Sequence, residues 1–153
     1  MLTASLSLSF SAVLCVIAAV LHFACLAWGA AGYRFLGAGE KAAAAVAAGD
    51  RRPHISAIVV GSMLLVWAAY ALAGAGVLPA MPLMHPVLLL ISGVLLVRAL
   101  AFPLLRPVFP GNSLKFWLVS SLAVGVLGLL FLVGEFGLRG AVERKIHLSG
   151  QFK

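Results

Sequence analysis

Four apolar stretches, each long enough to cross a bilayer as a helix, occupy most of this chain. They cover Leu8–Trp28, Ile55–Val77, Leu83–Leu105 and Leu114–Phe136. A helix needs about 20 mainly apolar residues to span roughly 30 Å of membrane hydrocarbon. Hydrophobic residues make up 63% of the chain and charged residues 10%, which leaves a soluble domain too few polar residues for its surface. The sequence therefore predicts an all-α, polytopic membrane protein, folded as a four-helix transmembrane bundle.

The whole chain, residues 1–153, is predicted to be a single membrane domain, with a polar tail at 137–153 that is a candidate for disorder. Its longest polar stretch between spans, Tyr33–His54, is too short to form a soluble domain. Within that stretch, Glu40–Ala48 predicts a short alanine-rich helix. The first apolar stretch has no basic start and exceeds the roughly 7–15 apolar residues of a signal peptide, so we expect it to be retained.

The formal net charge of +7 indicates basic loops that lie against anionic lipid headgroups. Nucleic-acid binding is not expected, because the chain lacks a surface pattern of aromatic residues among basic ones. The richness in Ala, Gly, Leu and Arg suggests a GC-rich bacterial gene, and hence a multi-pass protein of the bacterial inner (cytoplasmic) membrane. The basic residues favour the two long loops as the cytoplasmic ones, with both termini outside.

Small and polar residues recur every three or four positions along the first span and therefore share one side of a helix. They are Ser11, Cys15, Ala18, His22, Cys25 and Gly29. Small residues let helices approach closely and polar ones form interhelical hydrogen bonds, so this side should face the interior of the bundle. His22 either packs against a neighbouring helix, which is the commoner role, or contacts a ligand.

Arg98 is the most expensive residue to place in the membrane, at about 2.5–3.5 kcal/mol near the centre of a helix. Counted from the termini side, Arg98 lies about 22 Å into the bilayer and His22 about 21 Å. Residues at a shared depth suggest a ligand-binding polar layer, and alternatively Arg98 extends to the nearer surface and only marks the end of its span. The residues of the layer are His22, Cys25, Ser62, Arg98 and Ser121.

A second polar group, nearer the termini, consists of Tyr70, His85 and Glu135. Glu135 either pairs with His85 or sits in the membrane interface, and we expect the interface position. The span that carries Glu135 also has a stripe of small residues with Gly125 and Gly128, which predicts close helix packing.

The sequence shows no pattern typical of an active site or a metal site. His22 and His85 lie at different depths, so they cannot hold one haem between them. There is no cluster of Cys, His and acidic residues with metal-ligand spacing. Neither a Ser-His-Asp set nor paired carboxylates indicate a reaction. We therefore expect no cofactor, no metal and no catalytic residue.

Three segments carry a resemblance to a known family. They are Leu21-His22 with Tyr33-Arg34 and Gly37–Glu40, then Trp67–Gly76, then Arg98 with Leu104. In these segments the chain resembles a family of small uncharacterised inner-membrane proteins of proteobacteria, over the first three spans. The resemblance implies four helices and no known activity. Members carry Tyr-X-X-Arg in the third span, where this chain has Leu95-Leu96-Val97-Arg98 and so lacks the tyrosine.

The function expected from these features is that of a non-enzymatic accessory protein, or one that binds a lipid or another hydrophobic ligand. The first alternative is a small homo-oligomeric transporter or channel whose path follows the stripe of the first span. A membrane enzyme that acts on lipid or quinone is the third interpretation. Expected partners are membrane lipids and either another membrane protein or further copies of this chain.

Overall fold

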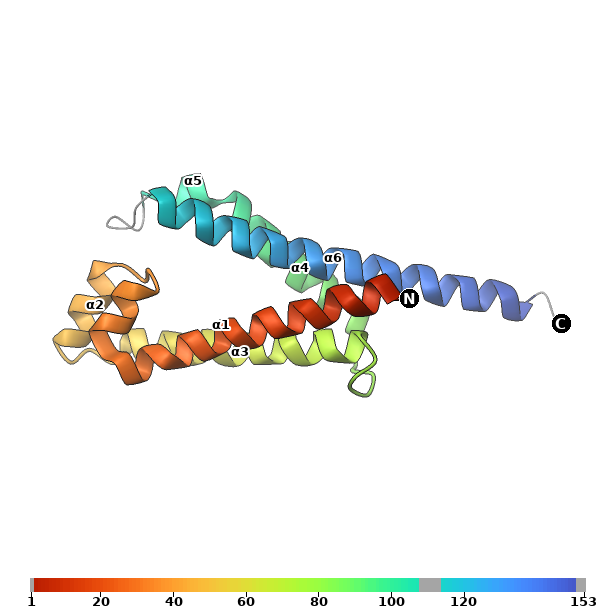
Figure 1. The fold of residues 1–153 in the computed structure, drawn as a ribbon, viewed down its shortest axis with the longest axis horizontal. Helices are drawn as coiled ribbons and strands as arrows, with labels where there is room; N and C mark the ends of the chain where they lie inside the picture. Colours follow the sequence, from red (N-terminus) through yellow and green to blue (C-terminus); the bar gives the residue numbers. More distant parts are fainter. Residues whose placement is uncertain (1, 108–113, 151–153) are drawn as a thin grey trace.

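The computed structural model describes residues 2–107 and 114–150, and every element in these two ranges is helical (Figure 1). The prediction of an all-α protein is thus confirmed. The helices are α1 (Leu2–Phe35), α2 (Glu40–Ala47), α3 (Arg52–Gly74), α4 (Met84–Leu100), α5 (Phe102–Leu105) and α6 (Leu114–Gly150).

Three of these helices are long and apolar enough to cross a membrane: α1, α3 and the Leu114–Arg144 part of α6. The third predicted span is shorter, because its helix α4 ends after 17 residues at Leu100. Ala101 forms a turn, and α5 follows with Pro103 in its first turn. A proline cannot donate the backbone hydrogen bond of a helix interior and clashes with the preceding turn, so it ends or kinks a helix. The structure therefore confirms a helical bundle with three long apolar helices.

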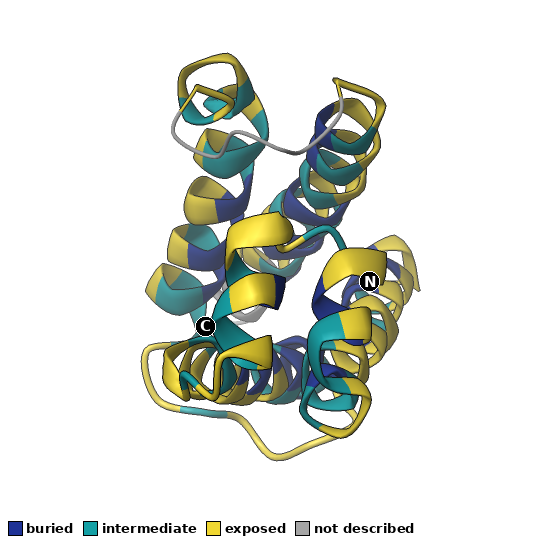
Figure 2. Ribbon diagram, turned by 90° about the vertical axis from the view of Figure 1, so that its left-hand side faces the viewer, coloured by how far each residue is buried: buried dark blue, intermediate teal, exposed yellow. Residues whose placement is uncertain are grey.

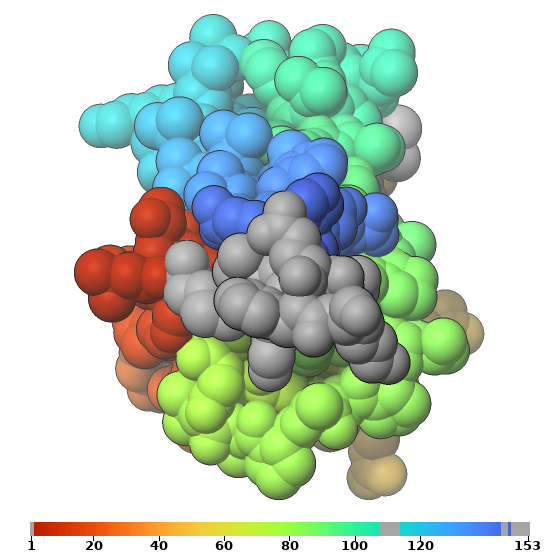
Figure 3. Space-filling view, turned by 90° about the vertical axis from the view of Figure 1, so that its right-hand side faces the viewer, coloured from red at the N-terminus to blue at the C-terminus, as the bar shows by residue number. Residues whose placement is uncertain are grey.

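The helices form two pairs, α1 with α3 and α4 with α6. The pairs lie closest together near the N-terminus and diverge toward α2 and α5 (Figure 1). Glycines in α6 permit the close approach, since a Cβ at Gly134 would lie 2.5 Å from Leu8 Cγ and one at Gly137 would lie 2.7 Å from Ala4 Cβ. Figure 3 shows this end of the molecule, where the start of α1, α6 and the link between α3 and α4 lie together.

Buried residues face inward between the helices and exposed residues cover the outside (Figure 2). The core includes the fully buried Leu8, Leu88 and Phe131. Large apolar side chains such as Phe10 and Leu122 are exposed along the outer faces. A soluble protein rarely exposes so extended an apolar surface, whereas lipid covers it at no cost. The arrangement is that of a multi-pass membrane protein.

The stripe predicted on the first span does face inward, since Ser11, Cys15 and Cys25 are buried. The tail differs from expectation, because α6 continues without a break to Gly150. The end of the apolar run is therefore not the end of the helix. No proline interrupts residues 137–150, and an ion pair between Glu135 and Arg139, four residues apart, supports the helix across the boundary.

The turn from α1 into α2 is held by an exposed ion pair. Arg34 donates hydrogen bonds from Nε and Nη2 to the Glu40 carboxylate, the shortest of them 2.7 Å long. These hydrogen bonds, with the attraction between the charges, hold the pKa of Glu40 below its ordinary value. Because the folded-state pKa is the lower one, the pair stabilises the turn above the pKa of an unfolded glutamate, and this contribution disappears as pH falls through the folded-state pKa.

Replacing Arg34 with glutamine should therefore raise the pKa of Glu40 toward that of a free glutamate. NMR titration of glutamate labelled with ¹³C at the side-chain carboxyl would measure the shift. Arg51→Gln is the matched control, because Arg51 is also exposed and forms no ion pair with Glu40 in the part of the chain that the structure describes. Equal Glu40 titrations in wild type and Arg34→Gln would contradict the prediction.

A candidate ligand cavity beside His22

A cavity of about 480 Å³ lies between α1, α2, α3 and the start of α6. Its walls are mainly apolar, with Ala18 and Leu21 from α1 and Val60 from α3. The polar groups that line it are few. They are His22, Cys25, Tyr33, Ser56 and Ser120. A cavity of this kind, apolar with a few polar groups, is typical of a small-molecule site.

The imidazole of His22 has a defined hydrogen-bonding state. Its Nδ1 lies 2.7 Å from the carbonyl oxygen of Ala18, and a carbonyl oxygen can only accept, so Nδ1 carries the hydrogen. In the neutral ring Nε2 is then an acceptor. His22 is half-buried on the cavity wall, so a ligand with an O–H or N–H group can bond to Nε2.

Tyr33 lines the end of the cavity toward α2 and contacts His54 behind it. The Tyr33 hydroxyl lies 2.8 Å from His54 Nδ1, and the two rings are 5.6 Å apart at an angle of 36°. Tyr33 is buried and lines the cavity itself, while His54 supports it from the first turn of α3. Neither residue was predicted from the sequence to belong to a site. The signal available was that they border the same polar stretch between two spans, and therefore lie at one membrane depth.

The wall formed by α6 closes the cavity from the side of the second helix pair. The ring of Phe116 packs against Gly37, so tightly that a Cβ at Gly37 would overlap it. Gly37 also has a positive φ of 75°, which glycine adopts without strain. Phe116 and Ser120 both line the cavity, and the cavity is thus bounded by both helix pairs.

The residues of the predicted polar layer lie in separate parts of the structure. His22 and Cys25 line the cavity, one turn apart on α1. Ser62 is exposed on the outer face of α3, whose inner face carries Gly61 instead. Arg98 and Ser121 lie in the α4–α6 pair and do not line the cavity. Depth along a helix was predicted from residue number, but the direction of a side chain depends on how the helix is rotated in the bundle.

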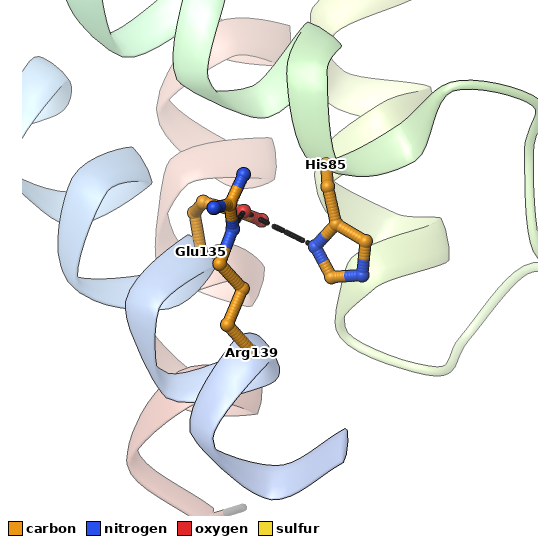
Figure 4. A network of polar contacts seen from close by, with 3 residues as sticks. All are labelled: His85, Glu135 and Arg139. Atoms are coloured by element: carbon orange, nitrogen blue, oxygen red, sulfur yellow. Dashed lines mark hydrogen bonds and ion pairs between the residues drawn. The ribbon is translucent and has the colours of Figure 1, made fainter. Parts of the chain in front are cut away.

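The second polar group differs from the prediction, because Glu135 contacts both His85 and Arg139 (Figure 4). Glu135 is fully buried, and its carboxylate accepts hydrogen bonds from His85 Nδ1 at 3.0 and 3.1 Å and from Arg139 Nε at 2.5 Å. The pairing of Glu135 with His85, one of the two predicted alternatives, is therefore present, and the position of Glu135 in the membrane interface stays a prediction. Tyr70 is not part of this group, because its hydroxyl donates to the carbonyl oxygen of Pro82 at 3.2 Å.

This cluster connects α4 to α6 through the contact of His85 with Glu135. Its residues are those expected of an ion pair that stabilises the fold. A buried carboxylate needs partners for its charge, and His85 and Arg139 supply them. Within residues 2–107 and 114–150, no group of three or more His, Cys, Asp and Glu side chains is placed to hold a metal ion.

Comparison of the chain with protein-family models, curated proteins and solved structures finds no match. The fold and its cavity define the class: a multi-pass α-helical membrane protein with a mainly apolar cavity between two helix pairs. The chemistry of that cavity is the best guide to function.

Proposed function

We propose that this protein is a small, non-enzymatic membrane protein that binds a hydrophobic ligand, such as a lipid, in the cavity beside His22. The observation that carries the proposal is the cavity itself. Its volume of about 480 Å³ falls in the range of roughly 300–1,000 Å³ found for small-molecule sites. Its apolar walls suit a hydrocarbon or ring system, and its few polar groups suit one polar end.

The polar end of the ligand should carry a hydrogen-bond donor. His22 offers Nε2 as an acceptor, because Nδ1–H is bonded to Ala18. Ser56 and Ser120 can both donate and accept. A hydroxyl or amide group on an otherwise apolar molecule satisfies this set. A glycerolipid hydroxyl and a hydroxylated ring are examples of the chemistry that fits.

The ligand can enter through the side of the protein. Ser56 lines the cavity and is itself exposed on α3, so the cavity reaches the surface there. We further propose that α4 is the fourth span, since its 17 residues meet the lower limit of about 17 for a membrane-crossing helix. In that arrangement the bundle lies in a bacterial inner membrane, a location that the richness of the chain in Ala, Gly, Leu and Arg supports.

Filling the opening of the cavity should remove the ligand. We expect Ser56→Trp to reduce co-purifying ligand to background, because the indole occupies the space next to His22 and Val60. Ile55→Trp is the matched control, since Ile55 is exposed on the same turn and does not line the cavity. Native mass spectrometry of gently extracted protein would measure the bound mass in each variant.

Two results would contradict this function. One is wild-type protein that carries no bound molecule after extraction in several mild detergents. The other is equal ligand occupancy in Ser56→Trp and Ile55→Trp.

A transporter is the second candidate function, and one observation favours it. Phe116 and Ser120 belong to one helix pair while His22 and Ser56 belong to the other, so movement between the pairs would reshape the cavity. Flux of a bound ligand across liposomes that contain the protein would favour transport. Binding without flux would favour the accessory role.

A further inference from the structure

Arg98 is a cation without an acidic partner. Within the described ranges its guanidinium forms no salt bridge. Glu40 is paired with Arg34, and Glu135 with Arg139. Glu143 lies about 39 Å farther along α6 than Trp117, the residue that Arg98 contacts. The remaining acid, Asp50, accepts a hydrogen bond from the backbone N–H of Arg52 and forms no salt bridge with Arg98, so no acidic side chain of the described ranges neutralises Arg98.

The guanidinium is nevertheless held in place. Its central carbon lies 5.1 Å from the centroid of the Trp117 ring, a cation–π contact that is stronger where water is excluded. That contact satisfies none of the N–H groups. Arg98 Nη1 is buried and has no hydrogen-bond partner in the described structure. Buried donors are normally bonded, so an unbonded one calls for a missing acceptor.

A second unsatisfied donor lies one turn from Trp117. Ser121 is only 7% exposed, and its Oγ also has no partner among the described residues. A serine in a helix commonly donates to the carbonyl four residues before it, as Ser11 does to Ser7 at 2.9 Å. Ser121 makes no such bond.

Ser121 lines an apolar groove of about 340 Å³ on the outer side of the α4–α6 pair. Small residues form part of its lining, and a Cβ at Gly125 would lie 3.4 Å from the Cβ of Ala99. Larger apolar side chains such as Phe102 and Leu122 line the rest. None of the residues that line this groove also lines the cavity beside His22.

We propose that this groove binds an anionic phospholipid. One acyl chain lies along the groove, and an oxygen of the phosphate or of the glycerol esters accepts a hydrogen bond from Ser121 Oγ. Arg98 does not itself line the groove, but it directly precedes the lining residue Ala99, so its guanidinium attracts the phosphate at that end. The guanidinium N–H can only donate and the serine hydroxyl can donate as well, so a ligand that supplies acceptors suits both groups, and the unbalanced positive charge selects an anion. Arg98 lies in the last turn of α4 and Ser121 in the second turn of α6, near the level where lipid headgroups begin.

The donors and the charge favour a lipid over a helix. The backbone carbonyls of a transmembrane helix are already used within that helix. A second copy docked symmetrically would bring the same surface, and hence another unbalanced Arg98. A lipid phosphate provides acceptors and negative charge together. This site is independent of the proposed His22 ligand, and either one can fail without the other.

Quenching of Trp117 fluorescence by brominated lipids tests the proposal directly. Trp28→Phe and Trp67→Phe leave Trp117 as the single tryptophan. The protein is placed in dioleoyl-phosphatidylcholine vesicles that contain increasing amounts of brominated phosphatidylglycerol or brominated phosphatidylcholine. We expect phosphatidylglycerol to associate on the order of fivefold more strongly, which is the effect of about one neutralised arginine.

Variants in the same background separate the contributions. Arg98→Gln should bring the ratio of the two association constants close to one. Ser121→Ala should lower the ratio partly, because the charge remains. Arg106→Gln removes an exposed arginine of the α4–α6 connection and should leave the ratio unchanged, and circular dichroism checks that each variant is folded.

Three outcomes would overturn the proposal. The first is equal quenching by the two lipids in the protein with the native Arg98. The second is the same lipid preference in Arg98→Gln or, should that variant not fold, in Ser121→Ala. The third is a dimer that dissociates when Gly125→Leu fills the groove while lipid preference is absent, which would assign the groove to a second copy of the chain.

Discussion

Replacing Arg139 with glutamine is expected to lower the free energy of unfolding by about 3 kcal/mol or more, because it leaves a buried carboxylate without its cation. The Glu135 side chain is fully buried, whereas Arg139 and His85 are partly exposed. The loss of stability therefore comes from Glu135, because its buried carboxylate cannot be hydrated in place of the lost ion pair. Denaturant titration in detergent micelles, followed by circular dichroism, would measure it.

The double variant Glu135→Gln with Arg139→Gln tests the cause. It removes both charges, so it should be more stable than Arg139→Gln alone. Arg144→Gln is the control for loss of an arginine on α6, since Arg144 is exposed. An Arg139→Gln variant as stable as Arg144→Gln would show that the buried pair is not coupled.

Replacing Gly137 with leucine is expected to destabilise the protein by about 3 kcal/mol, at the upper end for overpacking. A Cβ at this position would lie 2.7 Å from the Cβ of Ala4. Ala4 is buried and short, so no flexible side chain can move aside and the helices themselves must separate. The two helix pairs meet at this contact, and their separation would weaken the bundle as a whole.

Gly140→Leu is the matched control for Gly137→Leu. A Cβ at Gly140 would meet no atom within 4 Å, and leucine is a better helix former than glycine by up to about 1 kcal/mol. We expect Gly140→Leu to be neutral or stabilising in the same denaturant titration. Equal stabilities of the two variants would mean that α1 and α6 are not in close contact at Gly137.

Several local features of the fold could be predicted from the sequence. The stripe of the first span is one, because Ser11, Cys15 and Cys25 recur at the period of a helix and only one side of a lipid-embedded helix can be polar. The helix over Glu40–Ala47 is another. The continuation of α6 beyond Phe136 could not be predicted from hydropathy, because a helix can leave the membrane without unwinding.

The candidate sites were predicted only in part. His22 was identified because an imidazole inside an apolar span is costly, and it does line the cavity. The expected layer that joined His22 to Arg98 rested on depth alone. The contact between Tyr33 and His54 was not predicted. It depends on a kink in α1 at Gly29, whose φ of 56° is not helical.

The sequence by itself determined that this protein lies in a membrane as helices, since hydropathy adds up along each segment whatever its neighbours are. Only the tertiary structure decided which polar groups meet. Glu135 contacts Arg139 and His85. Arg98 packs against the Trp117 ring, and its Nη1 has no hydrogen-bond partner in the described residues. The physical reason is that such contacts depend on how each helix is rotated and where it crosses its neighbours. Those angles are set by packing between distant residues, such as Leu8 against Gly134.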